Sequence, residues 1–418
     1  MSDTRAAAPT SKPVVLTIAG SDSGGGAGIQ ADLKTIEATG GFGVSAITAV
    51  TAQNTTGVES SHRLPIAEIT AQIDAVREDF DVRAVKTGML ATAEVVETVA
   101  DYAAGFDAPV VVDPVMVATS GDRLLTEAAE SAYEDLLAEA TLATPNADEA
   151  AVLTGIEPTD EASALEAGRR LRSMGAEAAL IKGGHVPGAA VLDVLVGPGG
   201  AETMRHPRID TEATHGSGCT LSATIATRLA RGAPLEAAVE RGVSFMERAV
   251  RYHHAAGTGP GAVHHLVDLR NEAGRAGAIE TVREAADRLA EGGGDVSGAA
   301  ASAVDNVASA TPYAETGGDV AAVEGGVASS GSGDAGTVAP GRISFGADPA
   351  LGAALLDGRE RDPDLRVALA CRPDADLEDA LDASPCAVAD VDGGGIAVLS
   401  EDLDTALEAV EAAANRSG

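Results

Sequence analysis

Short apolar runs alternate with helical patterns from about residue 13 to residue 268, and this alternation limits the possible folds more than any other feature. Runs of strand length occupy residues 14–18, 44–52, 84–87, 110–112, 142–144, 178–181 and 191–196. Helical patterns occupy residues 30–38, 93–104, 127–138, 148–154, 162–173, 219–231 and 235–253. The order predicts a mainly parallel α/β sheet covered by helices, with ligands bound beyond the C-terminal ends of the strands.

The composition changes after this region. Residues 292–340 are rich in Gly, Ala, Ser, Val and Asp, and we expect them to form a flexible link because they offer little apolar area to bury. Strand patterns return at residues 343–345, 367–370, 386–389 and 396–399, with helical patterns at 348–356, 377–383 and 403–414. The sequence therefore predicts a second, small α/β module at the C-terminal end.

Acidic residues dominate the charge of the 418-residue chain. Its net charge is −35, from 64 acidic and 29 basic residues. Only four of the basic residues are lysine, namely Lys12, Lys34, Lys86 and Lys182. This profile is typical of a halophilic protein, because high salt screens the self-repulsion; ordinary acidic solubility is the alternative. We expect no binding to nucleic acid and none to an anionic membrane.

The three cysteines, Cys219, Cys371 and Cys386, have no metal-ligand spacing, and their odd number argues against a disulfide framework. The sequence has no apolar run of membrane-spanning length, and residues 1–12 have no signal-peptide core. These observations favour a cytoplasmic protein.

Residues 214–221, Thr-His-Gly-Ser-Gly-Cys-Thr-Leu, place Gly216, Ser217 and Gly218 directly before Cys219 at the start of a helical pattern. Unpaired backbone N–H groups and the positive end of a helix dipole attract phosphate. The same surroundings favour the thiolate form of a cysteine, which can act as a base in phosphoryl transfer. The alternative is that Cys219 is a small buried residue without a chemical role.

A second glycine-rich loop, residues 19–30, follows the first predicted strand and contains Asp22. Its spacing matches neither the dinucleotide fingerprint nor the P-loop, so a tight turn between strand and helix is the alternative to a ligand loop. Asp32 and Gln53 also lie near strand ends. The Gln53 amide can donate and accept hydrogen bonds, which suits a nitrogen heterocycle that carries an amino group. Taken singly, each residue is also explained as a local turn residue.

Polar residues follow three further strands. Asp113 ends the most apolar strand and can hold a divalent cation or its water. Asn146 and Glu149 stand three apart at a helix start, where a capping box is the alternative to a ligand site. Lys182 follows an apolar strand and is costly to bury unless an anion pairs with it.

Together these motifs resemble hydroxymethylpyrimidine (phosphomethylpyrimidine) kinase of thiamine biosynthesis, in the ribokinase superfamily. The resemblance covers residues 14–266 and rests on collinear motifs: Ala-Gly-Ser-Asp-Ser-Gly-Gly-Gly-Ala-Gly-Ile-Gln-Ala-Asp-Leu-Lys from Ala19, Thr-Ala-Val-Thr-Ala-Gln-Asn-Thr from Thr48, Lys-Thr-Gly-Met-Leu from Lys86, Asp-Pro-Val-Met from Asp113, Thr-Pro-Asn from Thr144, Lys-Gly-Gly-His from Lys182 and His-Gly-Ser-Gly-Cys-Thr from His215.

The resemblance implies a three-layer α/β/α sandwich and an ATP-dependent kinase that uses Mg²⁺. It implies phosphorylation of the pyrimidine alcohol and then of its monophosphate. It implies that Cys219 is the catalytic base and that Gln53, Asp22, Asp32, Met89 and Val115 face the substrate. Asp113 and Glu149 would then hold the metal, while Lys182, Asn146 and the loop of Gly216, Ser217 and Gly218 would hold the ATP phosphates. Pyridoxal kinase is the related alternative, and a homodimer is common in the superfamily.

The sequence departs from the kinase pattern at Thr119, where the family often has lysine. We expect the loss of this cation to weaken the second phosphorylation unless Arg123 or K⁺ compensates.

The C-terminal part resembles the archaeal thiamine-phosphate synthase domain that is often fused to this kinase. Arg366 matches a family arginine, but Asp348 and Pro349 replace an expected histidine, and no histidine follows His265. We expect a shortened module that senses thiamine phosphate or has lost its activity, with an active synthase as the alternative. The expected boundaries are 13–268 for the kinase, 269–341 for a helix and link, and 342–418 for the module.

Overall fold

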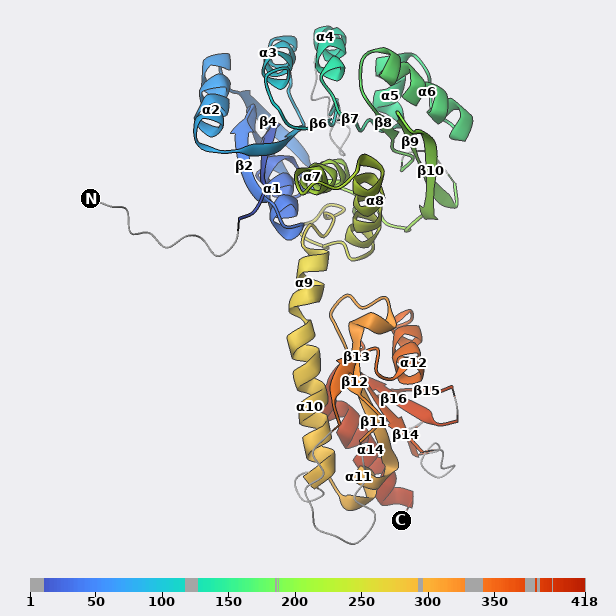
Figure 1. Cartoon of the computed structure of the whole chain (residues 1–418). Helices are drawn as coiled ribbons and strands as arrows, with labels where there is room; N and C mark the ends of the chain where they lie inside the picture. The colour runs from blue at the N-terminus through green and yellow to red at the C-terminus, as the bar shows by residue number, and fades with distance from the viewer. Residues whose placement is uncertain are drawn as a thin grey trace, which may run out of the picture. The chain divides into compact units, whose positions relative to one another are not determined.

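The computed structural model describes residues 11–116, 127–184, 186, 188–291, 296–327, 341–372, 380–381, 384–392 and 394–417. The chain divides into two compact units, Met1–Val267 and Asp268–Gly418. Figure 1 shows the elements of both units. In the described part of the chain, no helix is both long and apolar enough to cross a membrane.

An eight-stranded sheet forms the centre of the first unit, in the order β10-β9-β8-β7-β6-β5-β1-β2. Neighbours from β2 to β8 are parallel, and β9 and β10 complete the sheet in antiparallel pairing. The strands are β1 (Val14–Ala19), β2 (Phe42–Ile47), β5 (Val82–Thr87), β6 (Val110–Val112), β7 (Leu142–Ala143), β8 (Ala179–Ile181), β9 (Ala190–Gly197) and β10 (Gly200–Pro207). The parallel part confirms the predicted α/β architecture.

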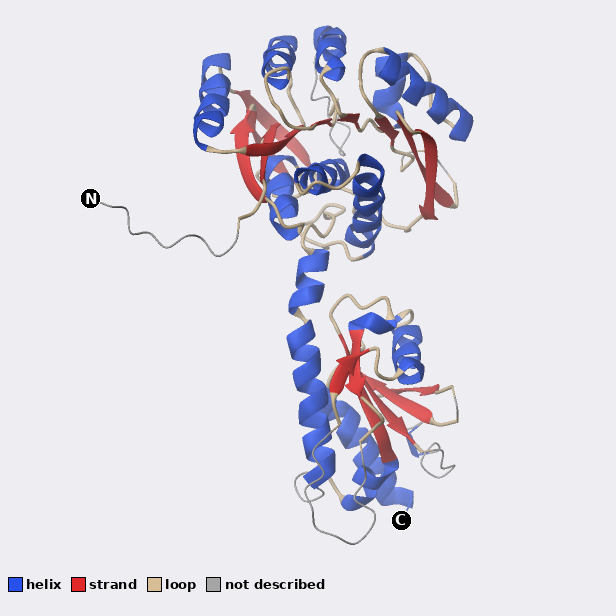
Figure 2. Ribbon diagram, viewed as in Figure 1, coloured by secondary structure: helices blue, strands red, loops and turns tan. Residues whose placement is uncertain are grey.

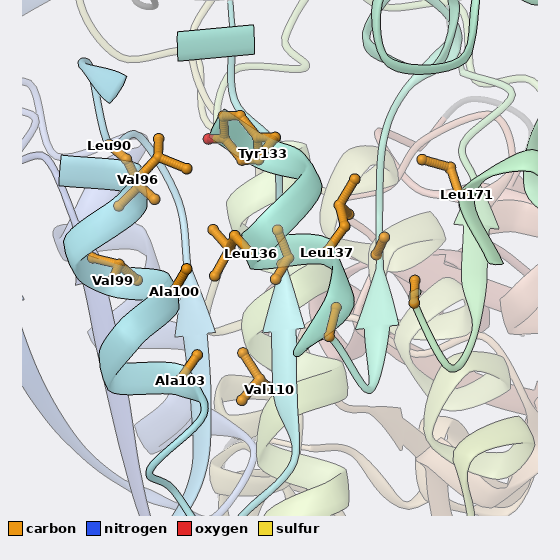
Figure 3. Packing of buried hydrophobic residues seen from close by; sticks show 14 of the residues in the cluster. Leu90, Val96, Val99, Ala100, Ala103, Val110, Tyr133, Leu136, Leu137 and Leu171 are labelled. Atoms are coloured by element: carbon orange, nitrogen blue, oxygen red, sulfur yellow. The ribbon is translucent and has the colours of Figure 1, made fainter. Parts of the chain in front are cut away.

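Helices cover both faces of this sheet (Figure 2). One face carries α2 (Ile66–Asp79), α3 (Ala93–Ala103), α4 (Glu127–Ala138), α5 (Ala147–Thr154) and α6 (Glu161–Ser173). The other carries α1 (Gly28–Ala38), α7 (Ser217–Ala230) and α8 (Leu235–Arg251). Figure 3 shows Val99 of α3 and Leu136 of α4 packed near Val110 of β6. Three layers result, as the resemblance implied.

The expected strand 44–52 is wrong as a single element, because the chain leaves the sheet at Thr48. The Thr48 hydroxyl donates to the Met89 carbonyl at 2.7 Å. The following strand, β3 (Ala49–Asn54), pairs with β4 (Gly57–Arg63) in a separate antiparallel ribbon. Strands β4 and β10 and helix α2 were not predicted. The polar Glu-Ser-Ser-His core of β4 gives no apolar run, whereas α2 shows its buried face through Ile69 and Ile73.

A six-stranded antiparallel sheet forms the centre of the second unit, in the order β13-β12-β11-β14-β16-β15. Its strands are β11 (Val304–Ala310), β12 (Val320–Val323), β13 (Ile343–Phe345), β14 (Val367–Cys371), β15 (Ala387–Asp390) and β16 (Ile396–Ser400). One face packs against α10 (Arg275–Glu291), α11 (Gly298–Ala303) and α14 (Leu403–Ser417), and the other against α12 (Pro349–Arg359). A short helix, α9 (Val267–Ala273), precedes α10, and a 3₁₀ turn, η1 (Gly317–Asp319), precedes β12.

The expectation of a flexible link is wrong for residues 296–327. Strands β11 and β12 lie there, and Val304, Val307 and Val323 are buried in the core of the second unit. Small Val and Ala side chains offer little apolar area singly, but a sheet covered on both faces buries all of it. The module therefore does not begin at 342. The expected helix 377–383 lies outside the described residues except for 380 and 381.

Candidate active site

The glycine-rich loop between β1 and α1 is held in shape by Asp22. Its Oδ1 accepts the Gly24 N–H at 2.8 Å, and its Oδ2 accepts the N–H groups of Gly26 at 3.0 Å and Ala27 at 2.7 Å. Burial raises the pKa of Asp22, but hydrogen bonds from His215 and these amides outweigh burial and keep the pKa below its usual value. Because the carboxylate is buried and occupied by the loop, Asp22 fits the turn role better than direct substrate contact.

Gln53 lies beside this loop. Its Nε2 is 3.4 Å from His215 Nε2, which in turn is 3.0 Å from Asp22 Oδ2. Ser23 ties strand β3 to the loop, because its hydroxyl accepts the Gln53 N–H at 2.8 Å and donates to the Gln53 carbonyl at 2.6 Å. The half-buried Gln53 amide is thus fixed at the loop edge, with only a long 3.4 Å contact from the Thr51 hydroxyl to its oxygen. It remains suited to bind a heterocycle.

Met89 and Val115 follow two neighbouring strands, β5 and β6. Met89 is nearly buried, and its methyl group lies against Gly20 so closely that a Cβ on residue 20 would be 2.2 Å away. Val115 is half-buried, and its N–H donates to the Asp113 carbonyl at 2.8 Å. Both residues stand at the C-terminal edge of the sheet, where the sequence placed them, next to the loop and to Asp113.

The N-terminus of α7 lies against the first glycine-rich loop. Gly216 has φ +82°, and a Cβ there would be 1.8 Å from the Gly26 carbonyl oxygen. No side chain caps this helix end in the described residues, so first-turn N–H groups such as those of Gly218 and Cys219 have no acceptor within the helix. The Ser217 N–H is not available, since it donates to the Thr214 carbonyl at 3.1 Å. This corrects the expectation for Ser217, whose amide would have held the ATP phosphates together with those of Gly216 and Gly218.

A cluster of charges lies next to this helix end. Nζ of Lys182 is 2.9 Å from Asp113 Oδ1 and 3.9 Å from Glu149 Oε2. A Cβ on Gly218 would be 3.2 Å from that nitrogen and 3.3 Å from Asp113 Oδ2, so the backbone of the helix end lies close to both charged groups. Burial lowers the pKa of Lys182, but Asp113 and Glu149 raise it above its usual value. Lys182 is therefore a charged ammonium that an incoming phosphate would share with two carboxylates.

Asn146 and Glu149 form the capping box that the sequence offered as an alternative. Asn146 Oδ1 accepts the Glu149 N–H and Glu149 Oε2 accepts the Asn146 N–H, both at 2.8 Å. Burial raises the pKa of Glu149 to about 7, against the opposing effect of Lys182. The cap does not exclude a ligand role, because Glu149 also faces the cluster of Lys182 and Asp113.

The carboxylates of this cluster suit a metal ion that takes most of its ligands from water and phosphate rather than from the protein. In the described residues, no group of three or more His, Cys, Asp or Glu side chains could hold a metal. Mg²⁺ is commonly held by one or two carboxylates together with phosphate oxygens and waters. Asp113 and Glu149 provide two such carboxylates beside a helix end that attracts phosphate. The residues therefore fit Mg²⁺ bound together with a nucleotide, rather than a cage made by the protein alone.

Cys219 is the third residue of α7 and is partly exposed. Burial raises its pKa to about 11; Lys86 lowers the pKa, whereas Asp32 and Asp113 raise it further. The expectation that the helix end favours the thiolate is therefore wrong for this structure. Loss of hydration and two nearby carboxylates outweigh the Lys86 ammonium and the hydrogen bond from the Gly28 N–H.

Asp32 and Lys86 form an ion pair in which both side chains are fully buried. Nζ of Lys86 is 2.9 Å from each Asp32 oxygen, and the Thr17 hydroxyl donates to Oδ2 at 2.6 Å. The expected contact between Asp32 and a substrate is not met here, because Asp32 exposes no surface. The sequence identified Lys86 as one of only four lysines but gave it no partner, since Asp32 lies far away along the chain.

A cavity of about 290 Å³ lies beside Lys182, lined among others by Asp160, Ile181, Gly183, Val186 and Leu192. Arg208 holds one wall of it: the guanidinium donates to the carbonyls of Gly184 and Gly188 at 2.8 Å each and of Val186 at 2.6 Å. Thr119 and Arg123 lie outside the described residues.

Residues 22–264 match the family model of phosphomethylpyrimidine kinase, and residues 281–405 match the model of thiamine-phosphate synthase ThiN. The hydroxymethylpyrimidine/phosphomethylpyrimidine kinase of Streptomyces coelicolor is 49% identical over 258 residues, which are 62% of this chain and 96% of the relative. The structure of phosphomethylpyrimidine kinase from Clostridium difficile has a TM-score of 0.52 and 39% identity, covering 57% of this chain and all of that one. An ADP complex of Bacillus subtilis pyridoxal kinase has a TM-score of 0.58 and 34% identity, covering 62% and 98%.

Proposed function

Because the chain belongs to the phosphomethylpyrimidine kinase family, we propose that its first unit phosphorylates 4-amino-5-hydroxymethyl-2-methylpyrimidine with ATP, and then phosphorylates the monophosphate to the diphosphate. These are steps of thiamine biosynthesis. We take the kinase to span residues 13–268. One observation carries the assignment: the glycine-rich loop after β1 meets the N-terminus of α7 at Gly26 and Gly216, with Cys219 in the first turn.

The N-terminus of α7 and Lys182 would stabilise the negative charge of the phosphoryl group during its transfer. N–H groups of Gly218 and Cys219 and the Lys182 ammonium offer positive charge at one place, next to the cavity that Lys182 lines. We assign the ATP phosphates to this place. Asp113 and Glu149 would hold Mg²⁺, which when bound neutralises phosphate charge. Asn146 would act through Glu149, whose backbone N–H and carboxylate it binds.

The pyrimidine would lie on the other side, near Gln53 and Met89. Its hydroxymethyl oxygen attacks the γ-phosphorus, the bond from phosphorus to the bridging oxygen of ADP breaks, and the hydroxyl proton passes to the Cys219 sulfur. The thiolate needed for this is a minor species at neutral pH, because burial raises the thiol pKa to about 11. The Gln53 amide would bind the ring nitrogen and amino group, and Met89 and Val115 would flank the ring.

An assay of phosphate transfer from ATP in molar KCl tests this function, because the net charge of −35 calls for screening. We expect the monophosphate first and the diphosphate later, with a slower second step because Thr119 replaces lysine. Repeating the assay in NaCl tests a role of K⁺. Pyridoxal at matched concentration is the competing substrate. Faster phosphorylation of pyridoxal than of the pyrimidine alcohol would contradict the assignment.

The second unit is similar to a thiamine-phosphate synthase, and we propose that it binds thiamine phosphate without making it. Asp348, which replaces an expected histidine, caps α12 by accepting the Leu351 N–H at 3.0 Å and accepts a hydrogen bond from Asn306 at 2.8 Å. Arg366 donates to the carbonyls of Thr311 and Pro312. An assay of the full chain with the pyrimidine diphosphate and the thiazole phosphate tests this. Formation of thiamine phosphate would contradict it.

A further inference from the structure

Four elements of the first unit meet at the fully buried ion pair of Lys86 and Asp32. Lys86 comes from β5, Asp32 from α1 and Thr17 from β1, and α7 packs on all three elements. Thr17, Asp32 and Lys86 are each 0% exposed. Gly88 makes room for the ammonium, since a Cβ there would lie 2.9 Å from Lys86 Nζ.

Stability alone does not account for this pair. Removing two charges from water costs several kcal/mol each, and apolar replacements of a buried ion pair are often neutral or stabilising. The pair also ties helix α1 to strand β5, but α1 already packs on β1 and on α7 without it. A role in the chemistry of the site is therefore the better explanation for its presence.

Cys219 is the chemical group on which the pair acts. Helix α7, which carries Cys219, packs on β5 and on α1, and the Gly28 N–H at the start of α1 donates a hydrogen bond to the sulfur. The charge of Lys86 lowers the pKa of Cys219, and the charge of Asp32 raises it. The positive charge of Lys86 favours the thiolate form of Cys219, whereas the negative charge of Asp32 disfavours it. The other charged groups that act on Cys219 are Asp113, after β6, and Lys182, after β8, which pair with each other at 2.9 Å.

We propose that Lys86 and Asp32 are positioning residues of the kinase reaction, whose buried charges set how readily the Cys219 sulfur accepts the proton of the substrate hydroxyl. Asp32, itself held by the Thr17 hydroxyl, fixes the ammonium, and Lys86 keeps its three protons throughout. The proton moves only between the substrate oxygen and the sulfur. This inference rests on the proposed function, since it gives Cys219 the part of the base.

Alkylation of Cys219 by iodoacetamide without any substrate tests the inference, because only the thiolate reacts at an appreciable rate. Trypsin releases Cys219 in the peptide of residues 209–228, so mass spectrometry separates its rate from those of Cys371 and Cys386. At pH 8.5 we expect Cys219 to react about tenfold faster in Asp32→Asn than in wild type and about tenfold slower in Lys86→Met. These rates correspond to a shift of the Cys219 pKa by about one unit, downward and upward respectively. Asp113 still favours the charged form of Lys86 in Asp32→Asn.

The opposite signs of the two expected rate changes distinguish an electrostatic role of the ion pair from a structural one. A purely structural role predicts that both variants loosen the site and react faster, and either that result or two unchanged rates would overturn the inference. The double variant Lys86→Met with Asp32→Leu replaces the pair by apolar side chains and protects the test against a misfolded single variant. It should react slowly like Lys86→Met; a rate above wild type would overturn the inference.

The kinase assay separates this inference from the proposed function. If the wild-type chain fails to phosphorylate the pyrimidine alcohol, the proposed function fails, whatever the alkylation rates are. If the kinase is active, the rise of kcat/KM with pH should begin at a lower pH in Asp32→Asn than in wild type. At neutral pH, kcat/KM should be higher in Asp32→Asn than in Lys86→Met. Equal pH profiles in these two variants would contradict the electrostatic role.

Discussion

The carbonyl oxygen of Gly26 lies against the α-carbon of Gly216, at a place where a Cβ on residue 216 would be only 1.8 Å from that oxygen. This contact joins the loop after β1 to the first turn of α7, which carries Cys219. The relative position of the substrate loop and the helix end therefore depends on the absence of a side chain at one residue.

Gly216→Ala should lower both the free energy of unfolding and the kinase rate. Gly232 is a matched control, because it has φ +83° against +82° for Gly216 but nothing within 4 Å of its Cβ position. Gly232→Ala should cost about 1 kcal/mol for its backbone conformation alone and leave the rate near wild type. Gly216→Ala should cost clearly more and lower kcat. Urea unfolding and steady-state kinetics measure both, and equal effects of the two substitutions would contradict the contact.

Cys219→Ala should lower kcat by a factor of about 10² to 10⁴, the usual scale for loss of a general base. In the wild type, kcat/KM should rise with pH from 7 to 10, because the thiol pKa is raised to about 11 and the thiolate fraction grows about tenfold per pH unit below that value. The residual activity of Cys219→Ala should lack this rise. Cys386→Ala, in the second unit, is the control. A flat wild-type profile would remove the thiolate from the mechanism.

Gln53→Ala should raise KM for the pyrimidine alcohol by roughly tenfold or more, as expected when hydrogen bonds to a ring are lost. KM for ATP should change little, because Gln53 lies beside Asp22 and His215 and away from the Lys182 cluster in the contacts observed. Initial rates with each substrate varied in turn measure both constants. An equal rise in the two would refute the assignment of Gln53 to the pyrimidine.

Lys182→Met should weaken the binding of ATP more than the binding of the pyrimidine. Asp113 and Glu149 would lose the cation that pairs with them. Their buried negative charges would then repel the phosphates. We expect KM for ATP to rise and kcat to fall, together by at least a factor of about 10² in kcat/KM. Lys12→Met is the control, because Lys12 forms an exposed pair with Glu37 at 2.8 Å. Unchanged ATP kinetics in Lys182→Met would exclude a phosphate role.

The second unit should unfold at a lower urea concentration when helix α10 is cut. Helix α10 contributes Ala278 and Val282 to the core of this unit. A fragment of residues 268–418 keeps both residues, whereas 284–418 loses them and exposes their partners in the sheet. We expect the shorter fragment to be less stable by about 2–5 kcal/mol, the usual cost of deleting buried aliphatic side chains. Identical urea midpoints for the two fragments would show that α10 is not part of the unit.

The sequence was sufficient to predict the parallel sheet of the first unit and the order of its loops. Strand and helix periods are local, and glycines or polar residues at strand ends are visible without any partner. Gln53, Asp113, Lys182 and Cys219 accordingly lie at the edge of the sheet where parallel strands end. The second unit was only partly foreseen, because β11 and β12 consist of small residues that look like a link until a sheet buries them.

Local patterns thus predicted the parallel strands of the first unit and the loops at their ends, since both follow from short-range periodicity and backbone freedom. They missed β4, β10 and α2 and wrongly placed the buried Asp32 against the substrate. Only the tertiary structure decided the charges of that site. It paired Lys86 with Asp32 and Lys182 with Asp113, and it raised the pKa of Cys219 where the sequence suggested a lower value. Burial and long-range Coulomb interactions depend on groups far apart in the chain, so no local pattern reveals them.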